Sequence, residues 1–270
     1  MNFGFWNISN NNYIDDVLYD FAWDNQLDVL MLGESTYSPQ SLLGILNKNK
    51  SAFYFAPSIV CDKIQFYTKF NPKNFKLITE TNRISARKLF SPKFGLVTLI
   101  VAHYNSKVNW SNEDQSAHIP TFKEIIDLAE KKTKHKRTIV CGDLNMNPFD
   151  TGMVQTTGLH SVMNKKIAER ISRTVDGRVY DFFYNPMWSF LGDSGKSRAA
   201  GTLYYSPAKP ISYHWNLFDQ VLIRPELINS FDESKLDIVS LIGTTDLLIN
   251  DNLINKKYSD HLPIKFSINI

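Results

Sequence analysis

Apolar runs rich in β-branched residues alternate along the first half of the chain with segments in which apolar residues recur every three or four positions. The runs are typical of buried strands, and the segments are typical of amphipathic helices. We expect strands at residues 2–7, 27–33, 53–56, 64–70, 76–80, 84–90, 94–102 and 138–141. We expect helices at residues 13–26, 39–46, 119–132 and 150–156.

The second half of the chain is less regular. Residues 161–212 are rich in aromatic side chains and contain a polar loop at 192–201. Beyond them the pattern predicts a helix at 245–255 and strands at 215–224, 236–242 and 264–268. Strands that alternate with helices indicate an α/β protein. Because no low-complexity linker divides the sequence, we expect a single domain over residues 1–270.

The composition narrows the class of protein. With 43% apolar residues, the chain can bury a substantial core without disulfides. A net charge of +3 is too small to indicate nucleic-acid binding by itself. The two cysteines, Cys61 and Cys141, are far apart in sequence, which favours a reduced, cytoplasmic protein. The chain starts without a signal-peptide pattern, and no apolar run approaches the roughly 20 residues of a membrane span, so we expect no membrane association.

The most informative stretch is residues 138–149. Its first four residues predict a buried strand, and Gly142 allows a sharp turn at which Asp143 and Asn145 follow. Open α/β sheets bind their ligands at such strand ends. Asp and Asn also favour turns for purely structural reasons, so this motif alone leaves both interpretations open.

The same arrangement recurs elsewhere in the chain. Polar residues close three other apolar runs and open two later ones: Asn7, Glu34 and His103 at strand ends, then Asp219, Asp260 and His261 at or near strand starts. Each has a simple structural alternative as a turn residue, a solvated acid or a hydrogen-bonded histidine. The alternative is weakest for Asp219, because a carboxylate in an apolar strand needs a partner. These groups converge only if the last two strands run opposite to the earlier ones, which predicts mixed sheets.

Together these side chains fit the cleavage of a phosphate ester. The carboxylates of Glu34 and Asp260, with the amide of Asn7, suit Mg²⁺ or Mn²⁺, which prefer oxygen ligands. The spacing of cysteines and histidines does not match that of a zinc site. A bound metal ion would hold the scissile phosphate and stabilise the charge that develops on it.

The remaining polar groups are predicted to be catalytic. Asp219 would hold His261 in one tautomer and keep it cationic, so that it donates to a phosphate oxygen or assists proton transfer. Asp143 either orients the attacking water or protonates the leaving oxygen, and Asn145 holds either one in line. We count His103 with these catalytic residues.

The ordered motifs resemble those of the endonuclease/exonuclease/phosphatase superfamily, which has the deoxyribonuclease I-like fold. The motifs are Trp6-Asn7, Leu32-Gly-Glu34, Ala102-His103, Gly142-Asp-Leu-Asn145, Phe218-Asp219-Gln-Val-Leu222 and Ser259-Asp-His-Leu-Pro-Ile264. The resemblance spans residues 6 to 264 and implies a four-layer sandwich of two mixed β-sheets flanked by helices. It also implies Mg²⁺-dependent cleavage of phosphodiesters or phosphomonoesters, with Glu34 as a metal ligand and His261 and Asp219 as a dyad.

Some positions depart from the family's pattern. Gly33 stands where many relatives have Gln, Val101 where many have Asn, and Gln220 where several have His. Ser9 occupies a position at which abasic-site enzymes carry an acid. These departures leave the core chemistry intact, but they argue against the abasic-site branch and against a second metal ligand near the N-terminus.

The sequence says less about the substrate. A basic cluster at 131–137 could track a nucleic-acid backbone, although positive charge at the end of a helix also complements the helix dipole. In the polar loop at 192–201, Arg198 is a candidate phosphate ligand. We therefore expect a nuclease that acts on DNA or RNA, with no obligate protein partner. The alternatives are a phosphatase of a small phosphorylated metabolite and a binding module that has lost catalysis.

Overall fold

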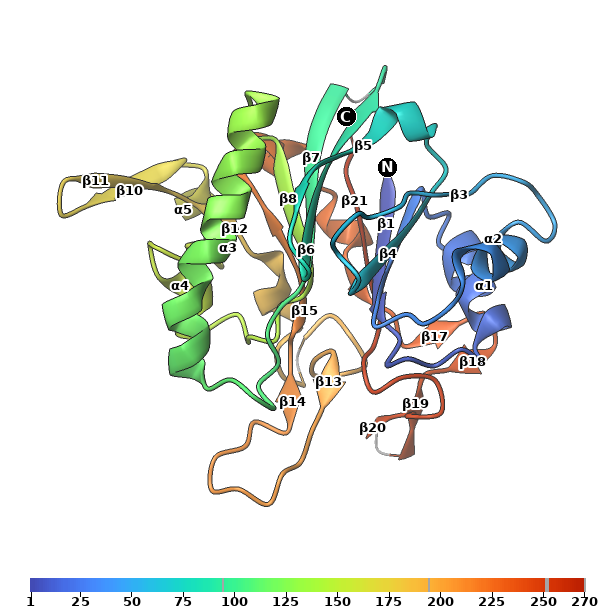
Figure 1. Cartoon of the computed structure of the whole chain (residues 1–270). Helices are drawn as coiled ribbons and strands as arrows, with labels where there is room; N and C mark the ends of the chain where they lie inside the picture. The colour runs from blue at the N-terminus through green and yellow to red at the C-terminus, as the bar shows by residue number, and fades with distance from the viewer. Residues whose placement is uncertain (94, 194, 251–252, 270) are drawn as a thin grey trace.

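The computed structural model describes residues 1–93, 95–193, 195–250 and 253–269. Two β-sheets pack face to face, and helices cover the outer face of each, so the molecule has four layers (Figure 1). The helix α3 (Asn112–Thr133) covers one sheet, while α1 (Asp15–Asp24) and α2 (Pro39–Leu46) lie on the other side. The predicted α/β sandwich is therefore confirmed.

The first sheet has the strand order β16 (Asp237–Ile238), β21 (Ile264–Ser267), β1 (Asn2–Asn7), β2 (Val29–Gly33), β4 (Ile64–Thr68) and β3 (Tyr54–Phe55). The second has the order β5 (Phe75–Glu80), β6 (Ile84–Ser91), β7 (Gly95–His103), β8 (Thr138–Asp143), β15 (Asp219–Ile223), β12 (Phe183–Tyr184) and β9 (Ser161–Val162). The start predicted for the β7 strand, residue 94, lies outside the described residues.

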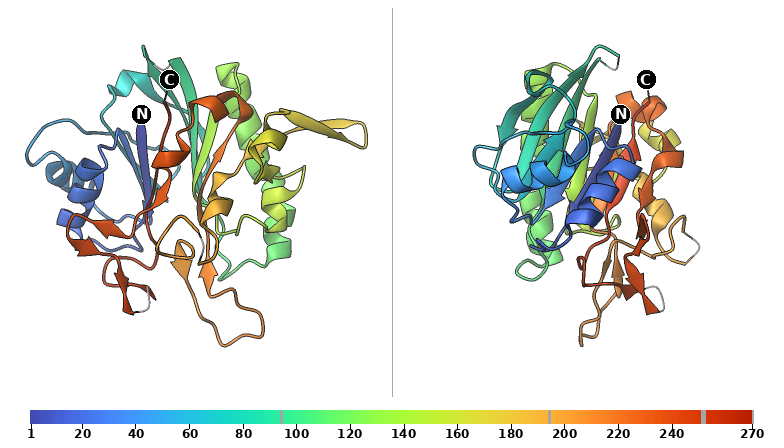
Figure 2. Two further views of the ribbon diagram at one scale, coloured as in Figure 1. Left: turned by 180° about the vertical axis from the view of Figure 1, so that it is seen from behind. Right: turned by 90° about the vertical axis from the view of Figure 1, so that its right-hand side faces the viewer.

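Smaller elements connect the strands of the two sheets. The short helices are α4 (Thr151–Val154) and α5 (Lys165–Ala168), with 3-10 turns η1 (Pro72–Asn74), η2 (Pro186–Phe190), η3 (Pro225–Ser230) and η4 (Glu233–Lys235). The hairpins pair β10 (Ser172–Val175) with β11 (Arg178–Asp181), β13 (Leu203–Tyr204) with β14 (Trp215–Asn216), β17 (Leu241–Ile242) with β18 (Thr245–Asp246), and β19 (Leu248–Ile249) with β20 (Leu253–Ile254). In Figure 2 the β10–β11 hairpin and the loop joining β13 to β14 project from the body in different directions.

Strand directions decide where polar side chains can meet. Strand β1 runs parallel to β2, and β7 runs parallel to β8. Strand β21 is antiparallel to β1, and β15 is antiparallel to β8. Both sheets are therefore mixed, as predicted, and the starts of the late strands lie at the same edge as the ends of the early ones.

The core occupies the spaces between the layers. One cluster of buried apolar side chains combines residues of both sheets with those of α1 and α2, and a second lies between the second sheet and α3. Strand β8 belongs to both clusters, and all its residues are buried, which agrees with its continuous apolar run. Both cysteines are free and buried. Among the described residues, none of the helices combines the length and apolar character needed to span a membrane.

A buried ion pair fixes the end of β15 against α3. The guanidinium of Arg224, which directly follows β15, donates from Nε to Glu130 Oε1 (2.8 Å) and from Nη2 to Glu130 Oε2 (3.2 Å). A third donor, Nη1, bonds to the carbonyl of Phe182 at 3.0 Å. Because a buried charge without partners is very costly, this contact strongly favours one position of β15 relative to the helix.

The structure corrects several predicted elements. The helix predicted at 245–255 is wrong: the described part of that segment forms β18, β19 and β20, and residues 251–252 lie outside it. Its apolar residues Leu247, Leu248 and Ile254 are buried against the body from short extended pieces, and this tertiary packing overrides the local pattern. The strand predicted at 236–242 divides into β16 and β17.

The strand predicted at 215–224 is also interrupted. It divides into β14 and β15 because two backbone amides between them bond to side chains instead of a neighbouring strand. Leu217 N donates to Asn147 Oδ1 (2.8 Å), and Phe218 N donates to Thr202 Oγ1 (3.2 Å). Asp219 therefore starts β15 at the edge of the sheet, where it was expected to lie inside a longer strand.

Helix α3 starts earlier than predicted. A capping box, in which Ser111 Oγ accepts from Asp114 N and the Asp114 carboxylate accepts from Ser111 N, begins it at Asn112. Its first two turns are mostly polar, so the apolar periodicity starts only at Ile119.

Candidate active site

The predicted site residues meet at one edge of both sheets, the lower edge in Figure 1. Asn7 ends β1, Glu34 directly follows β2, and His103 and Asp143 end β7 and β8. In the second sheet, the backbone register places Asp143 opposite His103 on one side and opposite Asp219 on the other. Convergence of these side chains follows directly from strand order and direction.

Gly142 allows this close packing of strands. It has φ of 136°, and a Cβ atom on it would lie 2.0 Å from the carbonyl oxygen of Ala102 in the neighbouring strand. Side chains other than hydrogen are excluded there by both the backbone conformation and the contact. The glycine before Asp143 is therefore required for β8 to lie beside β7 at the point where the site begins.

Asp143 is the centre of the site. Its Oδ1 accepts from the backbone N of Asn145 at 2.9 Å, and its Oδ2 accepts from Asn7 Nδ2 at 3.1 Å. The same Oδ2 lies 3.5 Å from His103 Nε2 and 3.9 Å from His261 Nε2. The side chain is almost completely buried, and this burial raises the pKa of Asp143, although the two histidines oppose the effect.

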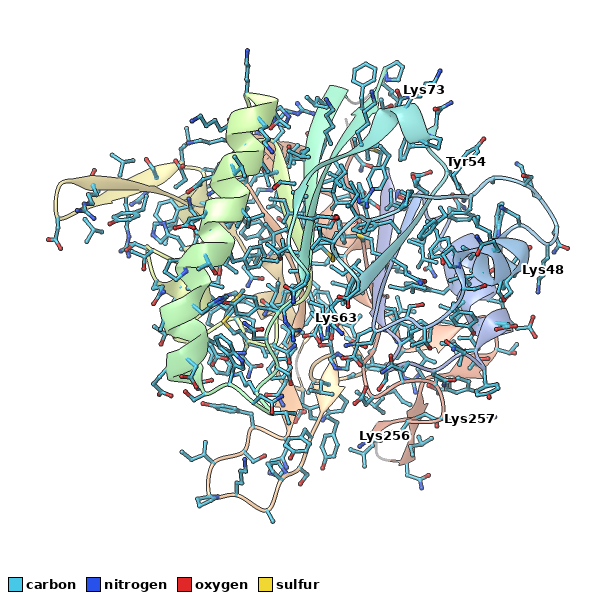
Figure 3. All side chains as sticks on the ribbon, in the orientation of Figure 1. Lys48, Tyr54, Lys63, Lys73, Lys256 and Lys257 are labelled. Carbon is cyan, nitrogen blue, oxygen red and sulfur yellow. The ribbon has the colours of Figure 1, made fainter. Side chains whose placement is uncertain are left out.

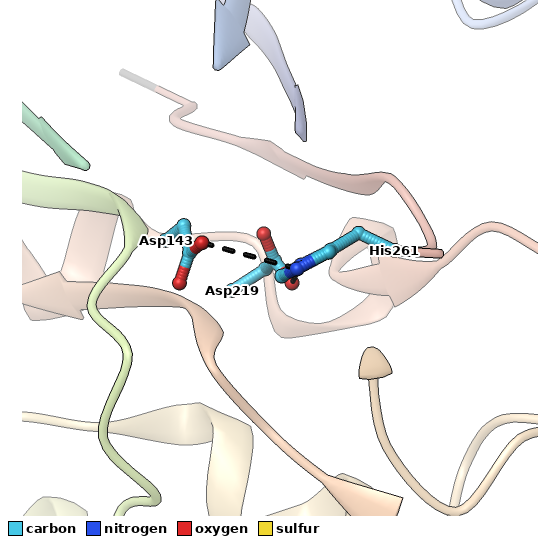
Figure 4. Close-up of side chains that lie close together, drawn as sticks. All are labelled: Asp143, Asp219 and His261. Carbon is cyan, nitrogen blue, oxygen red and sulfur yellow. Dashed lines mark hydrogen bonds and ion pairs between the residues drawn. The ribbon is translucent and has the colours of Figure 1, made fainter. Parts of the chain in front are cut away.

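His261 and Asp219 form the expected pair. The Nδ1 of His261 lies 2.8 Å from Asp219 Oδ2, and Figure 4 shows the side chains of Asp143, Asp219 and His261 close together. Burial acts to lower the pKa of His261, but Asp219 and then Asp143 outweigh it and raise that pKa to about 10. His261 is therefore cationic at neutral pH, with its Nδ1 proton directed to Asp219.

This cluster has the composition of a cation site. Asp143, Asp219 and His261 each offer a ligand atom, and these atoms lie within 4.8 Å of one another, so the cluster could bind a metal ion in place of a proton on His261. In addition, the Oδ1 of Asp219 is buried and has no hydrogen-bond partner in the described part of the chain. Buried polar atoms are rarely left unpaired, which makes the site attractive to a cation or to a proton donor.

Glu34 approaches the same nitrogen of His103 as Asp143 does. Its Oε1 is 3.2 Å from His103 Nε2, and this hydrogen bond lowers the pKa of Glu34, so the carboxylate is ionised at neutral pH. The backbone of Glu34 is left-handed, with φ of 46°, and its N donates to the carbonyl of Lys63 at 3.3 Å. Figure 3 labels Lys63 near the middle of the molecule in this view.

Two predicted site residues, Asp260 and Arg198, lie outside this cluster. Asp260 is half-buried beside His261, and in the described structure its carboxylate makes no hydrogen bond or ion pair with the other site residues. Arg198 is held by Asp246, with Nη1 3.3 Å from Oδ1 and Nη2 3.0 Å from Oδ2. Its guanidinium is thus occupied by a partly exposed ion pair.

Comparison with known proteins identifies the family. The sequence profile described as the Endonuclease/Exonuclease/phosphatase family matches residues 4–261. The chain belongs to this family. A search of curated protein sequences gives no match.

Solved structures of low sequence identity have the same fold. A 3′ phosphatase from Neisseria bound to a product DNA hairpin has a TM-score of 0.54 at 12% identity, and the comparison covers 100% of both chains. An AP endonuclease from Archaeoglobus fulgidus gives 0.57 at 13% identity, again over 100% of both chains. The catalytic domain of human Nocturnin gives 0.57 at 16%, over 100% of this chain and 94% of the other. The protein is accordingly a hydrolase of the endonuclease/exonuclease/phosphatase family with a buried Asp–His cluster.

The first and last motifs of the family pattern are tied together by residues that the sequence did not mark as functional. Ser259 Oγ donates to the carbonyl of Asn7 (2.7 Å) and accepts from His261 N (3.0 Å). Trp6 Nε1 donates to the carbonyl of His261 at 2.9 Å. Ser259 and Trp6 belong to the motifs given above, so their closeness in sequence to His261 and Asn7 is the signal that could have indicated that they position these two residues.

Buried amides hold the loop after β8. Gln115 Nε2 donates to the carbonyl of Asn145 (3.0 Å), and Gln220 Nε2 donates to that of Met146 (2.6 Å). The side chain of Asn145 itself donates to the carbonyl of Tyr104 at 3.1 Å. Gln220 is a position where this chain departs from several relatives, and here its amide fixes the loop that carries Asn145. The sequence pattern contains no direct signal for Gln115.

Proposed function

We propose that this protein is a divalent-metal-dependent phosphodiesterase that cleaves DNA or RNA. The observation that carries the proposal is the position of Asp143, whose carboxylate is shared among Asn7, His103 and the cationic His261 at the common strand edge. A carboxyl group of raised pKa such as Asp143 can give or take a proton near neutral pH, and the protonated His261 beside it can donate a hydrogen bond to a phosphate oxygen.

The donor set fits a hard cation. Glu34 is ionised and partly exposed, and Asn7 presents an amide oxygen that already accepts from Ser9 N at 3.0 Å. We propose that Glu34, Asn7 and Asp260 hold Mg²⁺ or Mn²⁺, which bind carboxylate and amide oxygens. When bound, the ion supplies positive charge that stabilises the phosphate as its charge increases.

The protein's own groups then have distinct tasks. His261, held by Asp219, donates a hydrogen bond from Nε2 to a non-bridging phosphate oxygen. Asp143 either takes a proton from the attacking water or supplies one to the leaving oxygen. Asn145 fixes the Asp143 carboxylate through its backbone N, and His103 orients Glu34.

Support for a nucleic-acid substrate comes from proteins of the same fold. Among structures with this fold are a phosphatase bound to a DNA product and an AP endonuclease, and we extend this substrate class to the present chain. A panel of supercoiled plasmid, single-stranded DNA, RNA and phosphorylated metabolites, each with Mg²⁺ and with EDTA, tests the proposal. Mg²⁺-dependent cutting of a polynucleotide is expected, whereas turnover of metabolites alone would reject it in favour of a phosphatase.

Glu34→Gln is expected to weaken metal binding. Glu34 and Asp260 are the two carboxylates proposed as metal ligands outside the Asp–His cluster. Loss of one of them should raise the dissociation constant for Mn²⁺ by about 10- to 100-fold. Isothermal titration of the wild type and the variant with Mn²⁺ measures this without any substrate. Glu233→Gln, on the 3-10 turn η4, is a matched control. Equal Mn²⁺ affinity in wild type and Glu34→Gln would remove Glu34 from the metal site.

Arg198 is proposed to bind a substrate phosphate after leaving Asp246. Arg198→Ala is then expected to raise KM on an oligonucleotide by about 10-fold, the usual size of one charge-assisted contact, with little change in thermal stability because exposed ion pairs contribute little. Asp246→Asn is the matched variant, because it releases the guanidinium without removing it and should not raise KM. If kcat/KM of Arg198→Ala equals that of the wild type, Arg198 has no part in substrate binding.

A further inference from the structure

A cavity of about 400 Å³ lies beside the site, between the start of β6, the end of β7 and the N-terminal half of α3. Its lining includes Arg83, Tyr104, Asn105, Trp110 and His118. None of these residues has a role in the chemistry described above. The cavity is nevertheless large enough for a group the size of a purine base.

Some residues that line the cavity are neighbours, along the chain, of residues in the active site. Tyr104 and Asn105 directly follow His103 in sequence, and Arg83 Nη1 lies 3.5 Å from the carbonyl of His103. The carbonyl of Tyr104 also accepts from the side chain of Asn145 at 3.1 Å. A group in the cavity would therefore lie next to the chain segment that carries His103.

Aromatic side chains form a pre-arranged wall. The Oη of Tyr104 lies 2.9 Å from His118 Nδ1, and the rings of Trp110 and His118 meet edge to face with centroids 5.0 Å apart. Tyr104 is buried, whereas Trp110 and His118 are half-buried and keep ring surface open to the cavity. Because these rings brace one another, Trp110 can offer a flat surface at little cost in entropy.

The cavity also contains an unpaired polar group. Asn105 is only 8% exposed, and in the described part of the chain its side-chain amide has no hydrogen-bond partner. Its backbone is fixed, since its carbonyl accepts from Gln115 Nε2 at 2.7 Å. The amide atoms of Asn105 are not enclosed by protein, and the residue lines the cavity, so the amide is available to a ligand with both donors and acceptors.

We propose that this cavity receives an unpaired nucleobase adjacent to the scissile phosphate, an inference that rests on the phosphodiesterase function proposed above. The base stacks on Trp110, the amide of Asn105 bonds to its edge, and Arg83 lies near the connecting phosphate. A base within a duplex cannot reach such a cavity without leaving the stack. The preferred substrate is therefore single-stranded or locally unpaired nucleic acid.

The test compares substrates with and without a base. On single-stranded oligonucleotides, Trp110→Ala and Asn105→Ala are expected to lower kcat/KM by about 10- to 100-fold, the range for loss of one stacked base. On bis(p-nitrophenyl) phosphate, which has no base, both variants should match the wild type. Trp110→Phe should retain most of the activity on oligonucleotides, because a ring remains. Tyr205→Ala, an exposed aromatic residue on the β13–β14 loop, is the control and should change neither reaction.

A second experiment changes the substrate together with the protein, as in a double-mutant cycle. An oligonucleotide with an abasic spacer next to the cleaved bond should be cut more slowly by the wild type, by the same factor as Trp110→Ala loses, and Trp110→Ala should show no further loss on it. If Trp110→Ala cuts the normal oligonucleotide as fast as the wild type, the base-binding role is wrong while the phosphodiesterase function stands. If the wild type hydrolyses bis(p-nitrophenyl) phosphate but no polynucleotide, the proposed nucleic-acid substrate is wrong. The proposed binding of a base in the cavity is then wrong as well.

Discussion

Asp143→Asn is expected to reduce kcat/KM on oligonucleotides by at least about 1,000-fold, the size of effect seen when a central catalytic group is removed. Asparagine keeps the shape of the side chain, and its single amide oxygen can still accept from Asn145 N. Its amide nitrogen cannot accept from Asn7 Nδ2, and the side chain can neither exchange a proton nor attract His261. Activity should be measured with an oligonucleotide and with bis(p-nitrophenyl) phosphate, because the loss must appear on both.

The same substitution should not destabilise the fold. Because burial raises the pKa of Asp143, its ionised form is disfavoured in the folded protein. The gain from a neutral side chain offsets the lost attraction to His261 and the lost hydrogen bond from Asn7, so Tm is expected to change little. Asp237→Asn is the control: burial raises the pKa of Asp237 also, but this residue pairs with Lys265 away from the site and should retain full activity. A variant of Asp143 that is folded and within a few-fold of wild-type activity would remove it from the mechanism.

The position of the site could be predicted from the sequence because it depends on where strands end. Apolar runs ending in Asn7, Glu34, His103 and Asp143 become strands whose ends fall at one edge, and the antiparallel late strands bring Asp219 and His261 to the same edge. This arrangement follows from burial and strand direction, both of which are visible in the hydrophobic pattern.

The supporting contacts could not be predicted in this way. Gln115 and Gln220 bond to carbonyls far away in the sequence, and a buried amide in an apolar segment resembles any tolerated polar residue. The pairing of Arg198 with Asp246 joins two loops without regular patterns. The helix predicted at 245–255 is wrong because the short extended pieces of this segment form hairpins and bury apolar side chains against the rest of the molecule, which the local pattern does not reveal.

Asp219→Asn is expected to change how stability depends on pH. The pKa of His261 is raised in the folded protein to about 10, from an ordinary value of about 6.5 in the unfolded chain. Below about pH 6.5 both states carry the proton and the contribution to stability is complete; as the pH rises the unfolded state loses the proton first, and the contribution has disappeared once the pH passes about 10. In EDTA, the wild type should therefore lose several degrees in Tm between pH 7 and pH 10 through this group, since roughly 1 kcal/mol shifts Tm by a few degrees in a protein of this size.

The variant removes the carboxylate that contributes most to this raised pKa, so its Tm should be lower than that of the wild type at pH 7 and should change less between pH 7 and pH 10. The pH dependence of kcat/KM should change in parallel, because loss of the cationic His261 at alkaline pH removes a donor to phosphate: the alkaline limb of the profile should move from near pH 10 toward neutrality. Direct titration of His261 by NMR, with Asp237→Asn as the reference variant, separates this local change from a general loss of stability. If the resonances of His261 titrate near pH 6.5 in both the wild type and Asp219→Asn, Asp219 does not hold the imidazole in its charged form, and the dyad has no electrostatic role.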